Sequence, residues 1–351
     1  MLLSEGINLY LSSRKEQGFA EGTLKANRQI LWKIFDISGE MDLKDFTVLT
    51  LDEVYRVESE RNLSVSTMNS IRSTMGAFSK WCRARGYMYT DQDPCADRRY
   101  RKRPGKVWPQ LPLSKFPALL DAAGSWHFRD RAFVAICMYT LCRASEVTYL
   151  KIKDVDLDTG FLNMTIKKTG DADRMPMSKE LQRELRRYFQ AWQEAIGEPL
   201  QPGWFLVPTG RVTSCVTKDD PRPRSEYYEL LPSRPMSNPQ VVVKRALAGV
   251  GWEFTGWDGI HVIRKSSARG VYDELVARGY DGAMRRVQTY LHHKSVTMTE
   301  HYLGLTLDRE MRDAETLNLP LFPSLDDANV IDMKGFRKEE EDDGEGIHSV
   351  V

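Results

Sequence analysis

The chain lacks the features that mark membrane or secreted proteins. Its 351 residues contain no apolar run of the length a membrane helix needs, about 20 residues. The amino terminus has no basic stretch followed by an apolar one, so no signal peptide is expected. The five cysteines are odd in number and show no CxxC spacing. This pattern predicts reduced thiols in a cytoplasm, that of a bacterial host cell, rather than a disulfide framework.

The chain also has little net charge, +1 at pH 7, which taken alone argues against a nucleic-acid partner. The distribution of charge changes that conclusion. Residues 325–351 hold nine acidic and three basic residues, a net charge of −6. The rest of the chain therefore carries +7, and a moderately basic body is what a DNA-contacting surface requires.

Apolar spacing predicts a mainly α protein with a small β-hairpin, in two domains and a tail. Residues 1–92 are expected to form a helical domain, with helices that begin after Thr23 and Ser64 as N-caps. Residues 93–110 are a basic linker, which is either a solvated tether or a phosphate contact.

Residues 111–310 are expected to form a second domain of mixed α/β character. Strands near residues 162–166 and 174–177 form a hairpin with Lys168 near its tip, and Ser178 caps a helix that runs to about Ile196. Residues 201–236 are expected to be an irregular loop without an assignable role. The tail, residues 311–351, ends in an acidic segment that is expected to be disordered.

Six residues of the second domain fit one chemical task. His261 and Arg264 are three positions apart, which places both side chains on one face of a helix. Cationic and hydrogen-bond-donating groups combined with a phenol indicate a site that holds a phosphate and attacks it with tyrosine. The six residues are Arg143, Lys168, His261, Arg264, His293 and Tyr302.

In order and spacing these residues resemble the motifs of the tyrosine recombinase family, also called the phage integrase family. Nine positions separate His293 from Tyr302, as the family pattern requires. The resemblance extends over roughly half of the chain and depends on the whole set rather than on any single motif. The matching pieces are Arg143-Ala144-Ser145-Glu146, Lys168-Thr169-Gly170, His261-Val262-Ile263-Arg264, Leu291-His292-His293 and Tyr302.

Two positions depart from the family pattern. Family members commonly have glycine two places before the first arginine, where this chain has Leu141, and just before the second histidine, where it has His292. A side chain at either place is expected to restrict the backbone to ordinary helical or extended conformations. Neither departure removes a catalytic group.

The resemblance implies a role for each site residue. Tyr302 is the nucleophile, and Arg143 and Arg264 hold the phosphate charge, because guanidinium forks offer paired donors and stay protonated. His261 accepts a proton or a hydrogen bond from the phenol, whose free pKa is about 10. His293 orients the phosphate.

Two further residues complete the set that the resemblance implies. Lys168 protonates the departing 5′ oxygen as a general acid. Glu146 is a supporting residue, since at three positions from Arg143 it can orient or neutralise that side chain.

Simpler interpretations compete with some of these assignments. Tyr290 is a second tyrosine in the region, but a tyrosine in an amphipathic helix is more often a core residue. His292 and His301 are expected to be structural, and the histidines lack the HExxH spacing of a zinc site. No metal and no other cofactor is expected.

The resemblance implies a site-specific DNA recombinase that works through a 3′-phosphotyrosyl intermediate and a four-way Holliday junction. It implies a homotetramer on two double-stranded attachment sites, and a tail whose apolar part docks on a neighbouring protomer. An accessory directionality factor would be a further partner, which the sequence does not reveal. The alternatives are a type IB topoisomerase-like nicking-closing enzyme and a non-catalytic DNA-binding regulator.

The remaining candidates are basic residues that could contact the DNA backbone. Their charges suit phosphate contacts, which position a protein on DNA without reading its sequence. The helical domain and the linker supply Lys25, Arg28, Lys80, Arg83, Arg98, Arg99, Arg101, Lys102, Arg103 and Lys106.

Overall fold

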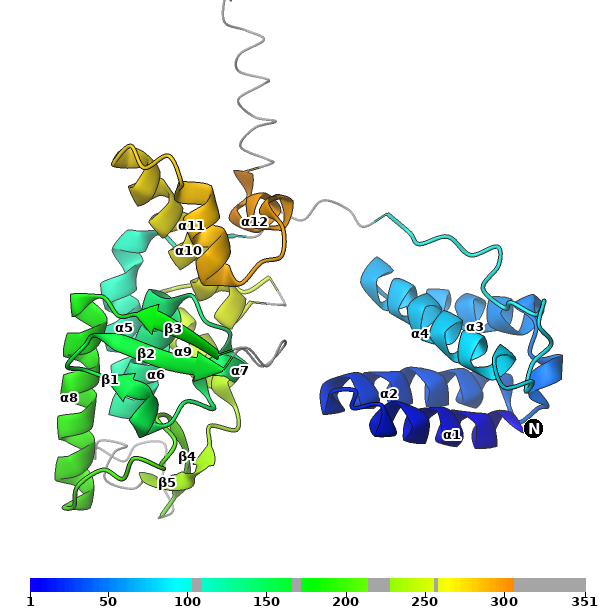
Figure 1. The fold of residues 1–351 in the computed structure, drawn as a ribbon, viewed down its shortest axis with the longest axis horizontal. Coiled ribbons are helices and arrows are strands. Elements are labelled where there is room, and N and C mark those ends of the chain that lie inside the picture. Colours follow the sequence, from blue (N-terminus) through cyan, green and yellow to red (C-terminus); the bar gives the residue numbers. More distant parts are fainter. Residues whose placement is uncertain (103–108, 166–171, 214–227, 256–257, 306–351) are drawn as a thin grey trace, which may run out of the picture. The chain divides into compact units, whose positions relative to one another are not determined.

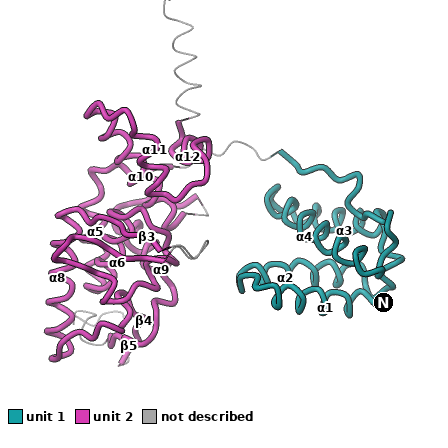
Figure 2. The backbone as a smooth tube through the Cα atoms, viewed as in Figure 1, with its two compact units in different colours: residues 1–106 teal, residues 107–351 magenta. Residues whose placement is uncertain are grey.

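The computed structural model describes residues 1–102, 109–165, 172–213, 228–255 and 258–305. The chain divides into two compact units, residues 1–106 and residues 107–351 (Figure 2). The described elements are mainly helical with two small antiparallel sheets, which confirms the fold class predicted from the sequence (Figure 1).

The first unit is a bundle of four helices around one apolar core. Leu3, Tyr10, Phe46 and Phe78 are among its fully buried side chains. Each helix contributes an apolar face at 3.6-residue spacing, as a surface helix of a globular domain does. The helices are α1 (Leu3–Glu16), α2 (Glu21–Ser38), α3 (Val48–Glu60) and α4 (Val65–Arg83).

The helix starts in this unit bear out one predicted cap and correct the other. Ser64 caps α4, since its Oγ accepts a hydrogen bond from the Thr67 backbone N–H at 3.2 Å. Thr23 is not a cap, because α2 already begins at Glu21 after Ala20. Glutamate in the first turn suits the positive end of the helix dipole, so the helix starts before the threonine.

The basic segment after α4 packs against the first unit instead of leaving it at residue 92. Cys95 is buried in the core of this unit. The Asn69 side-chain amide donates to the Arg101 carbonyl and accepts from the Arg101 backbone N–H, both at 2.9 Å. Compact packing therefore extends at least to residue 101, because a paired amide and a buried thiol hold the segment in place.

The second unit is built around a largely buried helix, α6. This helix is apolar on nearly all sides, and Phe133 to Met138 are all buried. Such a helix belongs in the centre of a domain rather than at its surface. The helices before the sheets are α5 (Phe116–Gly124), α6 (Phe128–Thr140) and α7 (Ala144–Val147), and those that follow are α8 (Lys179–Ile196), α9 (Pro239–Gly249), α10 (Ile260–Ala277), α11 (Ala283–Leu291) and α12 (Val296–Leu303).

A three-stranded antiparallel sheet packs on the same core. Its strands are β1 (Val155–Asp156), β2 (Phe161–Thr165) and β3 (Ala172–Pro176), in that order. The predicted hairpin is therefore present, with Thr165 opposite Ala172. Ser178 caps α8, whose Leu181 N–H donates to Ser178 Oγ at 3.2 Å, and the helix ends at Ile196 as predicted.

The stretch expected to be an irregular loop contains a second hairpin. Strands β4 (Pro208–Val212) and β5 (Tyr228–Pro235) pair antiparallel. The proline and serine content concealed the strands. Pro208 and Pro235 lie at strand ends, and Pro232 lies within β5 at the irregularity between the Leu231 and Pro235 pairs, so none of them interrupts a regular ladder. This corrects the expectation for residues 201–236.

The last three helices lie together at one end of the second unit (Figure 1). They share a small apolar cluster to which α6 contributes Leu141, the residue that ends it. The other fully buried members are Ala268, Val287, Leu291 and Leu303. This cluster fixes α10, α11 and α12 relative to the end of α6, where Arg143 begins the next helix.

Candidate active site

Glu146 lies between two arginines. Its carboxylate accepts hydrogen bonds from the Arg143 backbone N–H at 2.7 Å and from Arg143 Nη1 at 2.9 Å. Its Oε2 also lies 3.8 Å from Nη1 of Arg264, on α10. One carboxylate thus faces two guanidiniums, which leaves the group with a net positive charge that could attract an anion.

Arg264 is the buried member of this trio, with 2% of the residue exposed. Its Nη2 donates to the Leu291 carbonyl at 2.8 Å, while Nη1 is buried and has no hydrogen bond to any described residue. Burial lowers the pKa of Arg264, but a guanidinium remains charged at neutral pH. A buried donor without a hydrogen bond costs about 1–3 kcal/mol, so Nη1 is a donor that a ligand at this site could use.

Tyr302 lies on α12, which begins at a Ser295 cap: the Met298 N–H donates to Ser295 Oγ at 3.2 Å. The Tyr302 hydroxyl is buried and, within the described parts of the chain, has no hydrogen bond of good geometry. Burial raises the pKa of Tyr302, and the Arg264 and Arg143 guanidiniums oppose that rise. The phenol is therefore protonated in the free protein and lies near charges that would stabilise a phenolate.

Two histidines accompany Tyr302. The His293 ring lies edge-to-face against the Tyr302 ring, with centroids 5.2 Å apart and planes at 83°. His293 Nδ1 is 3.2 Å from Oγ1 of the buried Thr299, which fixes the ring orientation. His261 lines a pocket of about 280 Å³ together with Tyr302.

His261 has the electrostatic setting of a proton acceptor. It lies in the first turn of α10, where its side chain is exposed. Partial loss of water and the nearby Arg264 and Arg143 guanidiniums lower the pKa of His261. The imidazole is neutral at physiological pH, the form that can take up a proton.

Five of the six predicted site residues thus lie in one cluster, and the sixth lies outside the described residues. Lys168 belongs to the connection between Thr165, which ends β2, and Ala172, which begins β3. The competing tyrosine, Tyr290, is partly buried against the apolar core, and its hydroxyl accepts a hydrogen bond from Arg286 Nε at 3.4 Å.

Leu141 and His292 correct the expectation about their backbone. Both adopt the left-handed conformation, with φ 56° and ψ 22° at Leu141 and φ 51° and ψ 42° at His292. Each ends a helix, α6 and α11, at the position where this conformation turns the chain out of the helix. Tertiary contacts hold these residues in the conformation that glycine adopts most easily.

Comparison with known proteins identifies the family. The model of the phage integrase family matches residues 110–308, more than half of the chain. The chain belongs to the phage integrase family. All of the proposed site residues lie within the matched range.

One relative and two solved structures show how far this similarity extends. Tyrosine recombinase XerC of Lactobacillus delbrueckii subsp. bulgaricus is 29% identical over 166 residues, which are 46% of this chain and 56% of the relative. The chain thus spans about half the length of that relative.

The two structures are of lambda integrase. Residues 75–356 as a dimer bound to a COC′ core site align with 86% of this chain and 95% of that chain, at 19% identity and a TM-score of 0.64. A tetramer bound to a Holliday junction aligns with 86% of this chain and 77% of that chain, at 18% identity and a TM-score of 0.62. At these identities the shared property is the fold.

The structure adds two residues to the candidate site of this phage integrase family member. Neither of them was assigned a role from the sequence alone. Lys265 is 5% exposed and lines the same pocket as His261 and Tyr302. Thr299 is fully buried and contacts His293. Lys265 could have been found from its place beside Arg264, whereas the distance from Thr299 to His293 depends on the turn between α11 and α12.

The candidate DNA contacts fall into three groups. Arg83 and Arg98 are engaged within the first unit: Arg83 Nη1 donates to the Gln92 carbonyl at 2.7 Å, and Arg98 pairs with Asp52 and covers the Tyr55 ring. Arg103 and Lys106 lie outside the described residues. The exposed candidates are Lys25, Arg28, Lys80, Arg99, Arg101 and Lys102.

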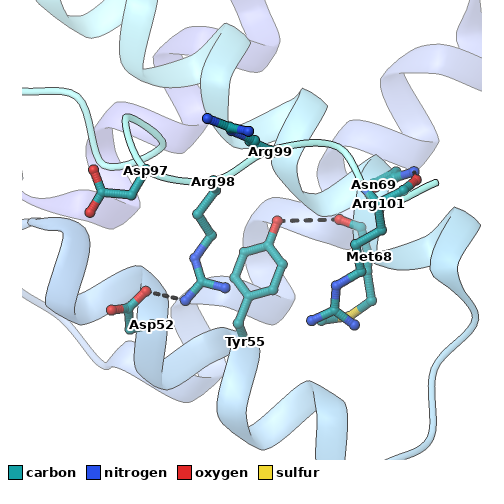
Figure 3. A pocket seen from close by; sticks show the side chains of 8 residues that line it. All are labelled: Asp52, Tyr55, Met68, Asn69, Asp97, Arg98, Arg99 and Arg101. Carbon is teal, nitrogen blue, oxygen red and sulfur yellow. Dashed lines mark hydrogen bonds and ion pairs between the residues drawn. The ribbon is translucent and has the colours of Figure 1, made fainter.

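Figure 3 shows why neighbouring arginines of the basic segment differ. The Arg98 side chain runs along Tyr55 to Asp52, whereas Arg99 points the opposite way. The Tyr55 hydroxyl donates to the Met68 carbonyl at 3.3 Å, which ties α3 to α4 beneath the segment. Arg98 therefore anchors the segment, and Arg99 presents its charge to solvent.

Neither a metal cluster nor a membrane helix is found where the structure is described. No group of three His, Cys, Asp or Glu side chains there could hold a metal ion. No described helix is both long and apolar enough to cross a bilayer.

Proposed function

We propose that this protein is a tyrosine-type site-specific DNA recombinase in which Tyr302 is the nucleophile. Tyr302 attacks the scissile phosphate, forms a 3′-phosphotyrosyl bond and releases a 5′ hydroxyl, which then attacks the partner phosphotyrosine. The covalent bond conserves the energy of the broken phosphodiester, so resealing needs no external energy source. The observation that carries the proposal is the burial of the Tyr302 hydroxyl beside Arg264, whose Nη1 has no hydrogen bond to a described residue.

The remaining residues supply what the reaction needs. Arg143 and Arg264 would bind the non-bridging oxygens, where negative charge grows in the transition state. His261 would accept the phenolic proton and His293 would orient the phosphate. Glu146 fixes both arginines through the contacts given above.

The reaction is completed by a leaving-group acid and by partner molecules, which we also propose. Lys168 would protonate the 5′ oxygen. A homotetramer on two DNA sites is supported by the shared fold with the lambda integrase tetramer bound to a Holliday junction. The first unit, which packs through residue 101, would bind DNA, and the segment that follows it up to residue 110 would link it to residues 111–310, which would carry catalysis. The tail would dock on a neighbouring protomer.

A trapping experiment tests the nucleophile. DNA fragments that the protein binds are first selected from a genomic library of its source organism. A nick is then introduced next to the bound site, so that the short strand carrying the released 5′ hydroxyl diffuses away and the covalent intermediate cannot be resealed. We expect a covalent adduct on the peptide that contains Tyr302, and none with Tyr302→Phe, which still binds the DNA. Tyr290→Phe is the matched control and should form the adduct normally.

The outcomes separate the alternatives. An adduct on Tyr290, or one that survives Tyr302→Phe, would overturn the assignment. Binding without any adduct would mean a DNA-binding regulator. Relaxation of supercoiled plasmid without exchange between two sites would mean a topoisomerase-like enzyme.

A further inference from the structure

The turn from Leu291 to His293 connects three parts of the candidate site. The Leu291 carbonyl accepts the hydrogen bond from Arg264 Nη2 at 2.8 Å. His293 contacts Thr299 and the Tyr302 ring on α12. Between them, His292 Nε2 lies 3.5 Å from Oδ2 of Asp173, on β3. Each of three consecutive residues thus reaches a different element.

His292 has a left-handed backbone conformation, which is unfavourable for a residue with a side chain. A left-handed conformation costs a residue with a Cβ roughly 1–2 kcal/mol compared with the right-handed one, and glycine adopts it freely. His292 has this conformation, and its side chain is nevertheless packed inward, with 15% exposed. The imidazole must therefore be held by contacts that offset the backbone cost.

The Asp173 carboxylate that His292 approaches is itself held in place. Asp173 Oδ1 accepts the Arg174 backbone N–H at 2.8 Å, which orients the carboxylate, and Oδ2 faces His292. Asp173 is also held in the sheet, opposite Met164 of β2. His292 Nε2 is buried and has no hydrogen bond of good geometry within the described ranges, so this carboxylate is the acceptor that it approaches.

The charges that face His292 come from four places in the chain. Asp173 on β3 and Glu146 on α7 favour the protonated imidazole, and Arg264 on α10 and Arg143 before α7 disfavour it. Burial dominates and lowers the pKa of His292. His292 is therefore neutral at neutral pH, and protonation at lower pH converts the contact into an ion pair.

We propose that His292 is a positioning residue: through Asp173 it holds the turn from Leu291 to His293 against β3, so that His293 and Arg264 stay aligned on the phosphate. This inference rests on the proposed recombinase function. The contact between His292 and Asp173 would connect β3 to the end of α11, the helix before the one that carries Tyr302. Because the link strengthens on protonation, and the lowered pKa places protonation in mildly acidic solution, it contributes more to alignment at pH 5 than at pH 8.

The test is single-turnover cleavage of the nicked trapping substrate at saturating protein. The variants are His292→Gly, Asp173→Asn and the double variant. We expect each to cleave about tenfold more slowly with unchanged DNA affinity, because small misplacements of catalytic groups have large effects on rate. The double variant should be no slower than either single variant, since both remove one contact.

The pH dependence distinguishes alignment from a general structural effect. The ratio of the wild-type rate to the His292→Gly rate should be larger at pH 5 than at pH 8. Glycine removes the backbone strain, so the variant should fold and its melting temperature should not fall. Asn62→Gly is the matched control, because Asn62 also has a positive φ of 53° and lies in the first unit. It should cleave like the wild type.

The inference is overturned if His292→Gly cleaves as fast as the wild type. It is also overturned if the rate ratio is the same at both pH values, or if the effects of the two single variants multiply. In each of these cases the wild type still forms its adduct, so the recombinase function stands. Absence of any wild-type adduct would instead refute the proposed function.

Discussion

The Glu146 carboxylate lies 3.8 Å from Nη1 of Arg264 while it accepts two hydrogen bonds from Arg143. A guanidinium just before α7 and one on α10 are thereby held by one buried side chain. Without this carboxylate their charges would repel each other, so Glu146 determines how close these two donors can lie.

Glu146→Gln should therefore uncouple binding from cleavage. Losing the negative charge raises the positive potential, so DNA binding should be maintained or tightened. The arginines lose their common anchor, so single-turnover cleavage should fall about 100-fold, an effect of the size seen when a preorganised donor is disturbed. Glu180→Gln, which removes an exposed charge in the first turn of α8 near Arg183 and Ser178, is the control and should cleave normally. Equal losses of binding and cleavage would contradict this account.

Tyr302→Phe should leave the protein as stable as the wild type, or more stable. The hydroxyl is buried without a hydrogen bond to a described residue, and removing such a group relieves a cost of about 1–3 kcal/mol. Thermal unfolding of both proteins without DNA measures this directly. A marked loss of stability would mean that the hydroxyl has a structural partner.

Leu141→Gly should destabilise the second unit although glycine suits the backbone there. The relief of left-handed strain is roughly 1–2 kcal/mol, but loss of a buried leucine costs about 2–5 kcal/mol. Leu141 is 2% exposed and packs with Val287, Leu291 and Leu303. Chemical denaturation should show a lower unfolding free energy for Leu141→Gly, whereas His292→Gly is expected to cause no loss of stability. A more stable Leu141→Gly variant would show that strain outweighs packing.

His127 should make the stability of the second unit depend on pH. It is 5% exposed, its Nδ1 accepts the Arg129 N–H at 3.1 Å, and burial lowers the pKa of His127 to about 3. The unfolded histidine, with a pKa of about 6.5, binds a proton that the folded one does not, so stability is lost as pH falls below about 6.5. The slope is up to about 1.4 kcal/mol per pH unit.

His127→Asn isolates this contribution, because asparagine can still cap α6 but does not titrate. The unfolding free energy of the wild type should fall more between pH 7.5 and pH 5 than that of the variant. The difference in unfolding free energy between the two proteins should therefore be smaller at pH 5 than at pH 7.5. Parallel curves for the two proteins would show that His127 is not buried in its neutral form.

Asn69→Ala should release the basic segment from the first unit. The Asn69 side-chain amide makes two hydrogen bonds to the Arg101 backbone, one to its carbonyl and one to its N–H. Limited trypsin digestion should then cut after Arg98 and Arg99 earlier than in the wild type. Ser70→Ala, which removes only a bond to the Ser66 carbonyl within α4, is the control. Unchanged digestion of Asn69→Ala would mean that Arg98 and Asp52 suffice to anchor the segment.

The sequence alone determined much of the secondary structure of this protein and predicted the chemistry proposed for it. Motif order singled out Arg143, Arg264, His293 and Tyr302 as candidates, because the proposed reaction restricts which residue types can serve. Local rules placed the β2–β3 hairpin and the α8 cap at Ser178, since turn and cap preferences act over a few residues.

Only the tertiary structure decided the rest. Within the proline-rich residues 201–236, β4 and β5 are strands because they pair with each other, although they are separated in the chain by residues 213–227. Glu146 reaches Arg264 as well as Arg143, and His292 reaches Asp173, through contacts between residues more than 100 positions apart. Leu141 and His292 adopt a left-handed backbone that local preference disfavours, because packing and electrostatic contacts formed only in the fold offset its cost.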